Sequence, residues 1–471
     1  MSICYAGLND RLVGAEIKIT IGDNHRLLKL ANALPWERLS EIVLPDLRRT
    51  TSKLKWWLGR SLQLRTHLGV YLLQQLFNET DRGIEKHIQD NAAYQMFCGL
   101  TIVKNWHCPD HTKIEEFRSR LSPETQCLLA NELAILAVQM GFADPCHIDI
   151  DSTIQEANIN YPAPSNLLVK LAGIAKRLSK PSINLSQEFK SQIPAINMRE
   201  VKAKARSYFF IQRKNMATLE AKLRQYKELW AVVAGAVMPV VRYCHELNLP
   251  AIHQTLSYGL RKQLEHFERK ALPFLDDCFE HIFNGTALHA KIYSFYVDAI
   301  ECFNKNKLNK KREFGRAFQL ERLKGNFMVV SKCTSIRMPD ADSVKPMITY
   351  HQQLFDDKNI LSVATDKGYY SKDNEAYLLE QKIAEVGLQR PERKLNKPPD
   401  NPISVDASEK LKNRRAGIEP LIGHLKQGWQ LGRSRMKLDQ TTESAGYSAV
   451  LGFNLRQLGR YLTGDAKIPT N

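Results

Sequence analysis

The hydrophobic period of the chain changes from helical to alternating in one short stretch, CHIDIDSTIQEANI, which begins at residue 146. There Ile148, Ile150 and Ile154 alternate with polar residues, as in a strand with one buried face. Before and after this strand, apolar residues recur at the three- and four-residue spacing of helices. Strand patterns return later in the chain, so the sequence predicts an α/β fold whose sheet is interrupted by a helical region.

The first 140 residues are predicted to be mostly helical, and no sheet is expected there. Amphipathic segments cover residues 35–48, 62–77, 83–94 and 123–140. The second and third segments, joined by NETD, have the pattern of a helix-turn-helix. Any α-hairpin would have the same pattern, so groove reading by this pair remains one of two interpretations.

Helical patterns return over residues 167–284, which predicts an all-helical insertion. In its most basic part, lysines and arginines are interleaved with Tyr208, Phe209, Phe210 and Tyr226. This combination suits contacts with phosphates and some stacking of bases, although a solvated helix face has a similar composition. The candidates for phosphate contact are Lys202, Arg206, Arg213 and Lys214.

Strand patterns resume in REFGRAFQLERL, in NFMVVSKC and in NILSVATDKGYY, with the KG between the first two as a turn. The last strand runs through apolar residues to Asp366 and breaks at Lys367 and Gly368. Asp366 is therefore expected at the C-terminal end of a central strand, where α/β sheets commonly place their ligands.

A third acid stands in the stretch RRAGIEPLIGHLKQG, which begins at Arg414. At about 100° per residue, Arg415, Glu419 and Lys426 fall at about 0°, 40° and 20° on a helix, within one narrow strip. Pro420 is favoured only in the first turn of a helix. If the helix begins at Pro420, a loop places Arg415.

The charge of the chain indicates a polyanionic partner. Its 67 lysines and arginines against 50 acids give +17, with a pI near 9.4. Nucleic acid is favoured over a membrane surface because the cations recur in separate places without an amphipathic anchor. The sequence has neither a secretory signal nor an apolar run long enough to span a bilayer, so a cytoplasmic protein is expected.

The nine cysteines are scattered without a C-x-x-C pair, which argues against a disulfide framework and a zinc knuckle. In WHCPDH, a cysteine and two histidines crowd together, but no second ligand pair follows at zinc-site spacing. The acids offer a different metal chemistry. Asp151, Asp366 and Glu419 are three carboxylates in a definite order, a set that can hold two magnesium ions for displacement at phosphorus.

The sequence resembles bacterial insertion-sequence transposases of the DDE class, particularly those with the signature Y-(2)-R-(3)-E-(6)-K. Arg415, Glu419 and Lys426 match its spacing, and Lys412 stands at the position of the tyrosine. The segments IDSTIQEANINYP, VATDKGYYS and RRAGIEPLIGHLKQGWQLGRSRMK resemble those that carry the three acids in that group. NAAYQMFCGL and FRSRLS resemble its helical leader, so the resemblance spans most of the chain.

The resemblance implies an RNase H-like catalytic core, with a mixed central sheet flanked by helices, over residues 141–166 and 285–440. The insertion at 167–284 would split this core, a helical N-terminal domain at 1–140 would bind DNA or dimerise, and 441–471 would form a C-terminal helix and tail. Asp151, Asp366 and Glu419 would be the catalytic and metal-binding triad. Asp149 is the rival of Asp151, because both lie on one strand face, but the acid directly before Ser-Thr fits the group better.

The implied activity is a DNA transposase that binds the terminal inverted repeats of an insertion sequence and cuts and joins strands with two Mg²⁺ ions, which Mn²⁺ may replace. Arg415 and Lys426 would contact the DNA backbone or orient the acid. The expected partner is double-stranded DNA, bound by a homodimer or larger assembly at the bacterial nucleoid. The alternatives are an RNase H-like nuclease that does not join strands and an inactive DNA-binding relative.

Overall fold

The chain folds into two compact units, Met1–Asn158 with Glu301–Asn471, and Ile159–Ile300. The predicted insertion, 167–284, lies inside the second unit. The structure, a computed structural model, describes residues 2–5, 17–49, 61–99, 108–183, 195–214, 217–246, 257–289, 292–304, 312–331, 338–356, 358–388, 405–437 and 439–468. No helix among these residues has the length and apolar character needed to cross a bilayer.

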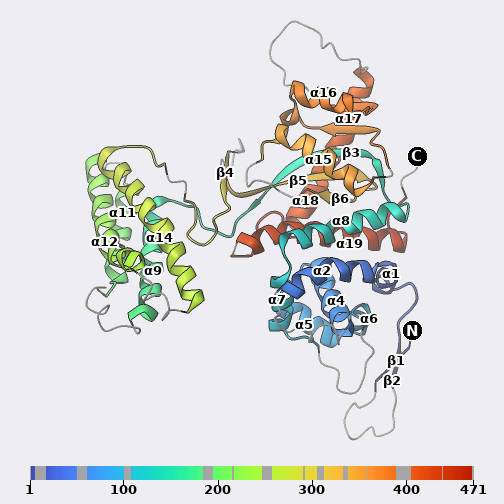
Figure 1. The fold of residues 1–471 in the computed structure, drawn as a ribbon, viewed down its shortest axis with the longest axis horizontal. Helices are drawn as coiled ribbons and strands as arrows, with labels where there is room; N and C mark the ends of the chain where they lie inside the picture. Colours follow the sequence, from blue (N-terminus) through green and yellow to red (C-terminus); the bar gives the residue numbers. More distant parts are fainter. Residues whose placement is uncertain are drawn as a thin grey trace. The chain divides into compact units, whose positions relative to one another are not determined.

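A mixed six-stranded sheet lies at the centre of the larger unit (Figure 1). Its strands run in the order β4-β5-β3-β7-β8, and β6 also pairs with β5. β3 is antiparallel to β5 and parallel to β7, which is parallel to β8. The bounds are β3 Asp144–Glu156, β4 Glu301–Asn304, β5 Arg312–Lys324, β6 Met328–Val330, β7 Ser362–Thr365 and β8 Glu385–Gly387.

The strand predictions are confirmed, since β3, β5, β6 and β7 each lie within or closely match a segment with the alternating or apolar pattern. The predicted KG turn joins β5 to β6. Gly325 adopts φ +104° there, and a Cβ atom would come within 3 Å of the Phe142 backbone. Only glycine combines this backbone conformation with so close an approach.

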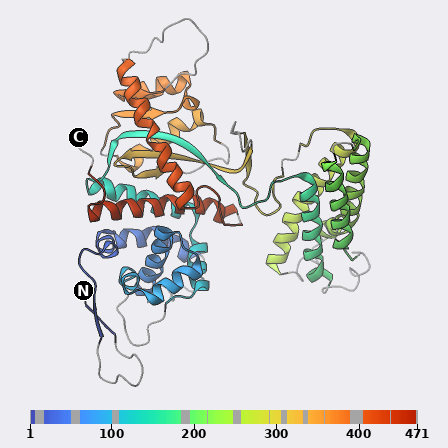
Figure 2. The ribbon, with the colours of Figure 1, turned by 180° about the vertical axis from the view of Figure 1, so that it is seen from behind.

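Helices cover both faces of the sheet. Asp149 and Arg322, paired across β3 and β5, share the face against which α17 (Val405–Ala416) packs. Glu321 lies on the other face of β5 and pairs with His351 of α15 (Asp340–Leu354). Seen from behind, α17 and α18 (Ile418–Gly428) follow one another across the sheet (Figure 2).

The helices of the first 140 residues share one hydrophobic core with the sheet and with the C-terminal helix. The Tyr71 hydroxyl of α4 donates to Gln126 of α8 and lies 3.0 Å from the Ser448 hydroxyl of α19. These helices are α1 Arg26–Ala33, α2 Trp36–Arg49, α4 Ser61–Phe77, α5 Asp81–Asp90, α6 Ala92–Phe97, α7 His111–Arg120, α8 Pro123–Gln139 and α19 Asp439–Thr463.

Two expectations for this region were wrong. The single helix predicted over 83–94 is two helices, because Asn91 ends α5 and its side chain caps α6 by accepting from the amides of Ala93 and Tyr94. A two-stranded antiparallel sheet also occurs where none was expected, formed by β1 (Ser2–Tyr5) and β2 (Ile17–Thr20).

The second unit contains four long helices and no strand in its described residues, as the periodicity predicts. It has its own core, in which apolar residues such as Leu168, Leu171, Leu229 and Val233 are fully buried. The helices are α9 Pro164–Ile183, α11 Met198–Arg213, α12 Leu219–Glu246 and α14 Tyr258–Phe279.

Candidate active site

Asp151 and Asp366 are neighbours on adjacent parallel strands. The last paired residues of β3 and β7 are Ile150 and Thr365, and each acid follows its strand's pair by one residue. The parallel register therefore places the two carboxylates side by side at the point where β7 ends, while β3 continues to Glu156. Asp366 also accepts a hydrogen bond from the amide of Lys367, at 2.7 Å, which fixes the turn after β7.

Glu419 approaches from the first turn of α18, and Arg415 from the last turn of α17. The helix therefore begins at Ile418, before Pro420, and Arg415 is placed by a preceding helix rather than by a loop. Pro420 is tolerated because amides in the first turn have no partner within the helix. Lys426 lies in the last turn of α18, half-buried, about 10 Å along the axis from Glu419.

One guanidinium group holds the three predicted acids together. Arg415 Nη2 lies 3.0 Å from Asp151 Oδ2 and 3.7 Å from Asp366 Oδ2, and Nη1 lies 2.8 Å from Glu419 Oε1. The acids come from β3, from the end of β7 and from α18, so residues far apart in sequence meet at one point. The structure thus brings together four of the residues that the sequence singled out.

The three carboxylates differ in their exposure. The Asp151 side chain is 16% exposed, whereas those of Asp366 and Glu419 are 53% and 60% exposed. Burial raises the pKa of Asp151; Arg415 and the Ser152 amide oppose this shift, and Asp366 adds to it. The cluster therefore combines one largely buried carboxylate, that of Asp151, with two that are open to solvent.

The donor set suits a hard divalent cation, because Mg²⁺ prefers carboxylate oxygens and keeps several of its waters. The carboxylates of Asp366 and Glu419 are open to water, and that of Asp151 contacts the same guanidinium. Among the described residues, however, no three acidic, histidine or cysteine side chains are grouped as a bound metal requires. Arg415 stands between the carboxylates, so the donors fit magnesium only if this side chain turns away.

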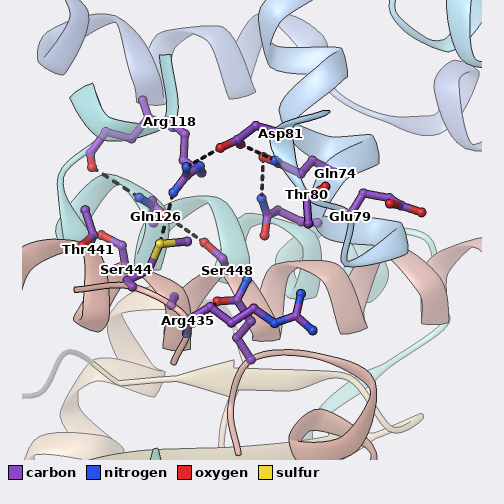
Figure 3. A pocket seen from close by; sticks show the side chains of 15 residues that line it. Gln74, Glu79, Thr80, Asp81, Arg118, Gln126, Arg435, Thr441, Ser444 and Ser448 are labelled. Carbon is purple, nitrogen blue, oxygen red and sulfur yellow. Dashed lines mark hydrogen bonds and ion pairs between the residues drawn. The ribbon is translucent and has the colours of Figure 1, made fainter. Parts of the chain in front are cut away.

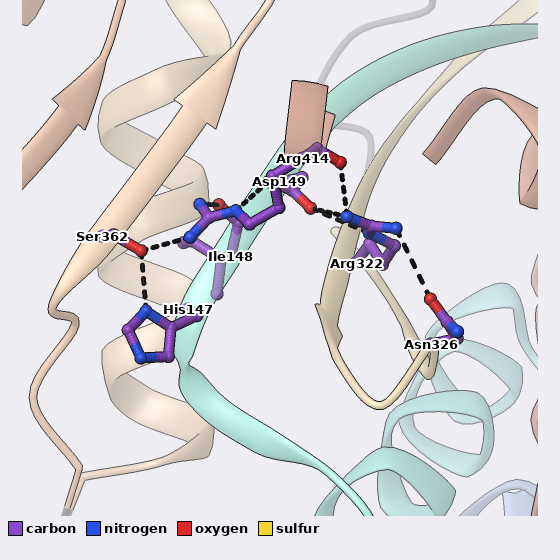
Figure 4. Close-up of polar contacts among 7 residues, drawn as sticks. All are labelled: His147, Ile148, Asp149, Arg322, Asn326, Ser362 and Arg414. Atoms are coloured by element: carbon purple, nitrogen blue, oxygen red, sulfur yellow. Dashed lines mark hydrogen bonds and ion pairs between the residues drawn. The ribbon is translucent and has the colours of Figure 1, made fainter. Parts of the chain in front are cut away.

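Asp149, the rival candidate, has a different environment (Figure 4). Its side chain is 3% exposed and accepts hydrogen bonds from Arg322 Nε and Nη2, at 2.8 and 2.5 Å, and from Arg414 Nε, at 2.8 Å. Arg414 also donates to Ser362 of β7 and to the backbone oxygen of Ile148. Asp149 thus anchors α17 to β3, β5 and β7 and is enclosed by its two arginines.

This anchor also sets the position of the neighbouring Arg415. Arg322 Nη2 donates to the backbone oxygen of Arg414 at 2.5 Å, which ties the end of α17 to the sheet. Gly417 follows at the break between the helices, and a Cβ atom there would come closer than 3 Å to the Arg322 guanidinium. The small residue allows α17 to end directly over this arginine.

A fourth acid escaped the sequence analysis. Asp340, the first residue of α15, is close enough to contribute to the raised pKa of Asp151. Tyr369 lies near both of these acids, and its buried hydroxyl donates to Gln319 at 2.9 Å. Burial, followed by the negative charge of these acids, raises its pKa well above the ordinary value. Nothing in the pattern MPDADS separates Asp340 from an ordinary acid in the first turn of a helix.

The four basic residues predicted in the insertion all belong to the second unit. Lys202, Arg206 and Arg213 lie on α11, and Lys214 follows as its C-terminal cap. All four are exposed, whereas the nearby Lys204 is paired with Glu228 of α12 at 2.7 Å. The aromatic residues also fall into two groups. Tyr208 stacks on the buried Tyr226, with ring centroids 4.7 Å apart, whereas Phe209 and Phe210 are exposed.

A polar cavity of about 220 Å³ lies elsewhere in the larger unit (Figure 3). It is lined by α4, α5, α7, α8, α19 and the segment after α18. Asp81 receives hydrogen bonds from Arg118 at 2.9 Å and from Gln74 at 2.6 Å, and Arg118 also contacts the sulfur of Met436 at 3.3 Å. These bonds join the N-terminal helices to the C-terminal part of the chain, and none of the predicted acids lines the cavity.

Comparison with known proteins gives two matches. Residues 15–120 match the family described as Transposase domain (DUF772). A protein of Rhizobium meliloti, described as "Uncharacterized protein ORF8 in nfe locus", is 25% identical over 189 residues, 39% of this chain and 87% of that protein. No solved structure matches the chain significantly. The family match, over residues 15–120, suggests a transposase, and the description of the Rhizobium protein states no activity.

Proposed function

We propose that this chain is a transposase of the DDE class, which binds the inverted repeats of an insertion sequence and cuts and joins DNA strands. The main support for the proposal is that the carboxylates of Asp151, Asp366 and Glu419 all contact the guanidinium of Arg415. Three separate elements deliver these acids to one point. The transposase-domain match covers a different part of the chain, residues 15–120, and supports the same class of function.

The sheet supports an RNase H-like core. Three antiparallel strands, β3, β5 and β6, are followed by two parallel strands, β7 and β8, on the other side of β3. The first acid stands on the central strand and the second at the end of its parallel neighbour. In the proposed core the helical second unit is an insertion between β3 and β4.

Asp151, Asp366 and Glu419 would hold two Mg²⁺ ions, or Mn²⁺ in their place. Such ions activate the attacking oxygen and stabilise the leaving oxygen during displacement at phosphorus. Arg415 would neutralise the acids in the absence of metal and then turn toward a DNA phosphate, where its guanidinium can donate two hydrogen bonds. Lys426, on the same helix as Glu419, would contact the backbone further along the DNA.

Double-stranded DNA, as element ends and as target, is the proposed partner. The net charge of +17 favours it, and the exposed cations of α11 supply sites for phosphate contact. Two ends must be processed together, so we propose at least a homodimer on DNA. A bacterial cytoplasmic location at the nucleoid follows from this role.

A nuclease of the same fold would share the acids and cut without joining. An inactive relative would bind DNA and do neither. These alternatives are separated by incubating the full chain with Mg²⁺, labelled terminal-repeat DNA from the flanks of its gene and a supercoiled target. The proposal predicts cleavage at the repeat ends and labelled strands joined to the target, both lost with EDTA. Cleavage without joined products would indicate the nuclease, and binding without cleavage the inactive relative.

A further inference from the structure

One face of α11 in the second unit combines cations and aromatic rings without an acid. Its exposed members are Arg199, Lys202, Arg206, Phe209, Phe210 and Arg213, which we call the α11 stripe. At about 100° per residue these six positions fall within a sector of about 100°. The acid of this helix, Glu200, lies outside the sector.

The cations of the stripe differ from their neighbours in their ion pairing. Arg199, Lys202, Arg206 and Arg213 form no ion pair with any described residue, whereas Lys204 and Arg224 both pair with Glu228. Lys204 and Arg224 are thus neutralised by an acid of the same unit. The stripe presents uncompensated positive charge, which favours a polyanion.

The two rings are unusual for a protein surface. Phe210 is 67% exposed and Phe209 is 37% exposed, although phenylalanine is among the residues most often buried. The opposite face of α11 carries the packing, through Val201, Ala205 and the half-buried Tyr208. Phe209 also contacts the ring of Tyr208, with centroids 6.0 Å apart, and Phe210 is the more exposed of the two rings. Both lie between Arg206 and Arg213, which are about 10 Å apart along the helix axis.

We propose that the α11 stripe binds unpaired DNA, with the arginines on phosphates and bases stacked on Phe209 and Phe210. In a duplex the faces of the bases are covered by their neighbours, whereas an unpaired strand exposes them to aromatic side chains. An anionic membrane fits less well, because the cations flank the rings within the same sector and leave no broad apolar face to insert. This inference rests on the proposed function, since it takes DNA as the partner.

The test compares two double variants of the full chain. Phe209→Leu with Phe210→Leu keeps apolar side chains but removes the rings, and Phe209→Trp with Phe210→Trp keeps ring faces. Fluorescence anisotropy measures binding to an oligothymidine of about 20 nucleotides, to an abasic strand of the same length and to a duplex. Leu219→Ala, at a 74% exposed position in the same unit, is the control for lost apolar surface.

The leucine variant should bind oligothymidine roughly tenfold or more weakly, and the tryptophan variant and Leu219→Ala should bind as the wild type does. Binding to the abasic strand and the duplex should change little. An unchanged leucine variant, or an equal loss on all three DNAs, would overturn the inference. The inference would also be overturned if the wild type bound phosphatidylglycerol vesicles and did not bind oligothymidine.

Failure of this inference can be told apart from failure of the proposed function. If the leucine variant is unchanged on every DNA while the wild type cuts terminal-repeat DNA, only the stripe is misassigned. If the wild type binds neither duplex nor single strand at about 50 mM salt, where phosphate contacts are strong, both fail.

Discussion

Replacing Asp149 by alanine should destabilise the larger unit strongly, although this acid lies only two residues from the candidate catalytic Asp151. The substitution removes a carboxylate that is 3% exposed and leaves Arg322 and Arg414, 13% and 26% exposed, without their anion. Breaking a buried ion pair from one side costs about 3–5 kcal/mol. Water can reach part of Arg414, so we expect the lower half of that range.

Urea unfolding followed by circular dichroism measures this loss in the full chain. A loss of about 3 kcal/mol is a large part of the roughly 5–15 kcal/mol that stabilises a typical domain. Glu419→Ala is the matched control, because its carboxylate is 60% exposed and its removal should change stability by about 0.5 kcal/mol or less. If Asp149→Ala unfolds within about 1 kcal/mol of the wild type, the anchoring role given to Asp149 is wrong.

This prediction changes the use of Asp149→Ala in activity assays. From the sequence alone, the substitution is the natural active control for Asp151→Ala. In the structure Asp149 fixes Arg414, the residue before Arg415, so its loss should also misplace the guanidinium that contacts the three acids. Inactivity of Asp149→Ala would therefore not identify it as a metal ligand.

Four further predictions concern metal, DNA and assembly. Arg415→Gln removes the cation that competes for the carboxylates, so calorimetric titration should show Mn²⁺ binding tighter on the order of tenfold, and equal or weaker binding would contradict the competition. Duplex affinity should fall roughly 10³-fold between about 50 and 200 mM salt if six or more phosphates are contacted, and a flat titration would refute this. Replacing Arg206, Arg213 and Lys214 together by alanine should make duplex affinity less dependent on salt, whereas an unchanged slope would show that α11 does not contact the DNA. The solution mass of end complexes should correspond to two or more protomers, and a single protomer would contradict the proposed assembly.

The strands and most helices were predictable because each carries a local signal. The alternation around Ile150 and the apolar run before Asp366 each mark a strand, and the helical period of α2 marks that helix. The break at Asn91 also had a signal, since asparagine is a preferred helix cap, but the continuous apolar pattern outweighed it. The candidate triad was found through order and resemblance, without knowledge of its geometry.

The centre of the site could not be predicted in the same way. Its geometry depends on the register of β3 with β7, which places Asp151 beside Asp366, and on the helix break at Gly417, which sets Arg415 against the acids. Both are properties of tertiary packing. The proximity of Asp340 to Asp151 also depends on how α15 packs on the sheet, and a single sequence contains no signal for it.

Cleavage by the three acid variants tests the central claim most directly. Asp151→Ala, Asp366→Ala and Glu419→Ala are compared with the wild type on terminal-repeat DNA in Mg²⁺, with a gel shift on the same DNA and circular dichroism to confirm folding. In the proposed mechanism basic and polar residues bind the DNA and the acids act in the transition state, so each variant should bind the ends and fail to cut them. Full cleavage by a folded Glu419→Ala protein would contradict the triad.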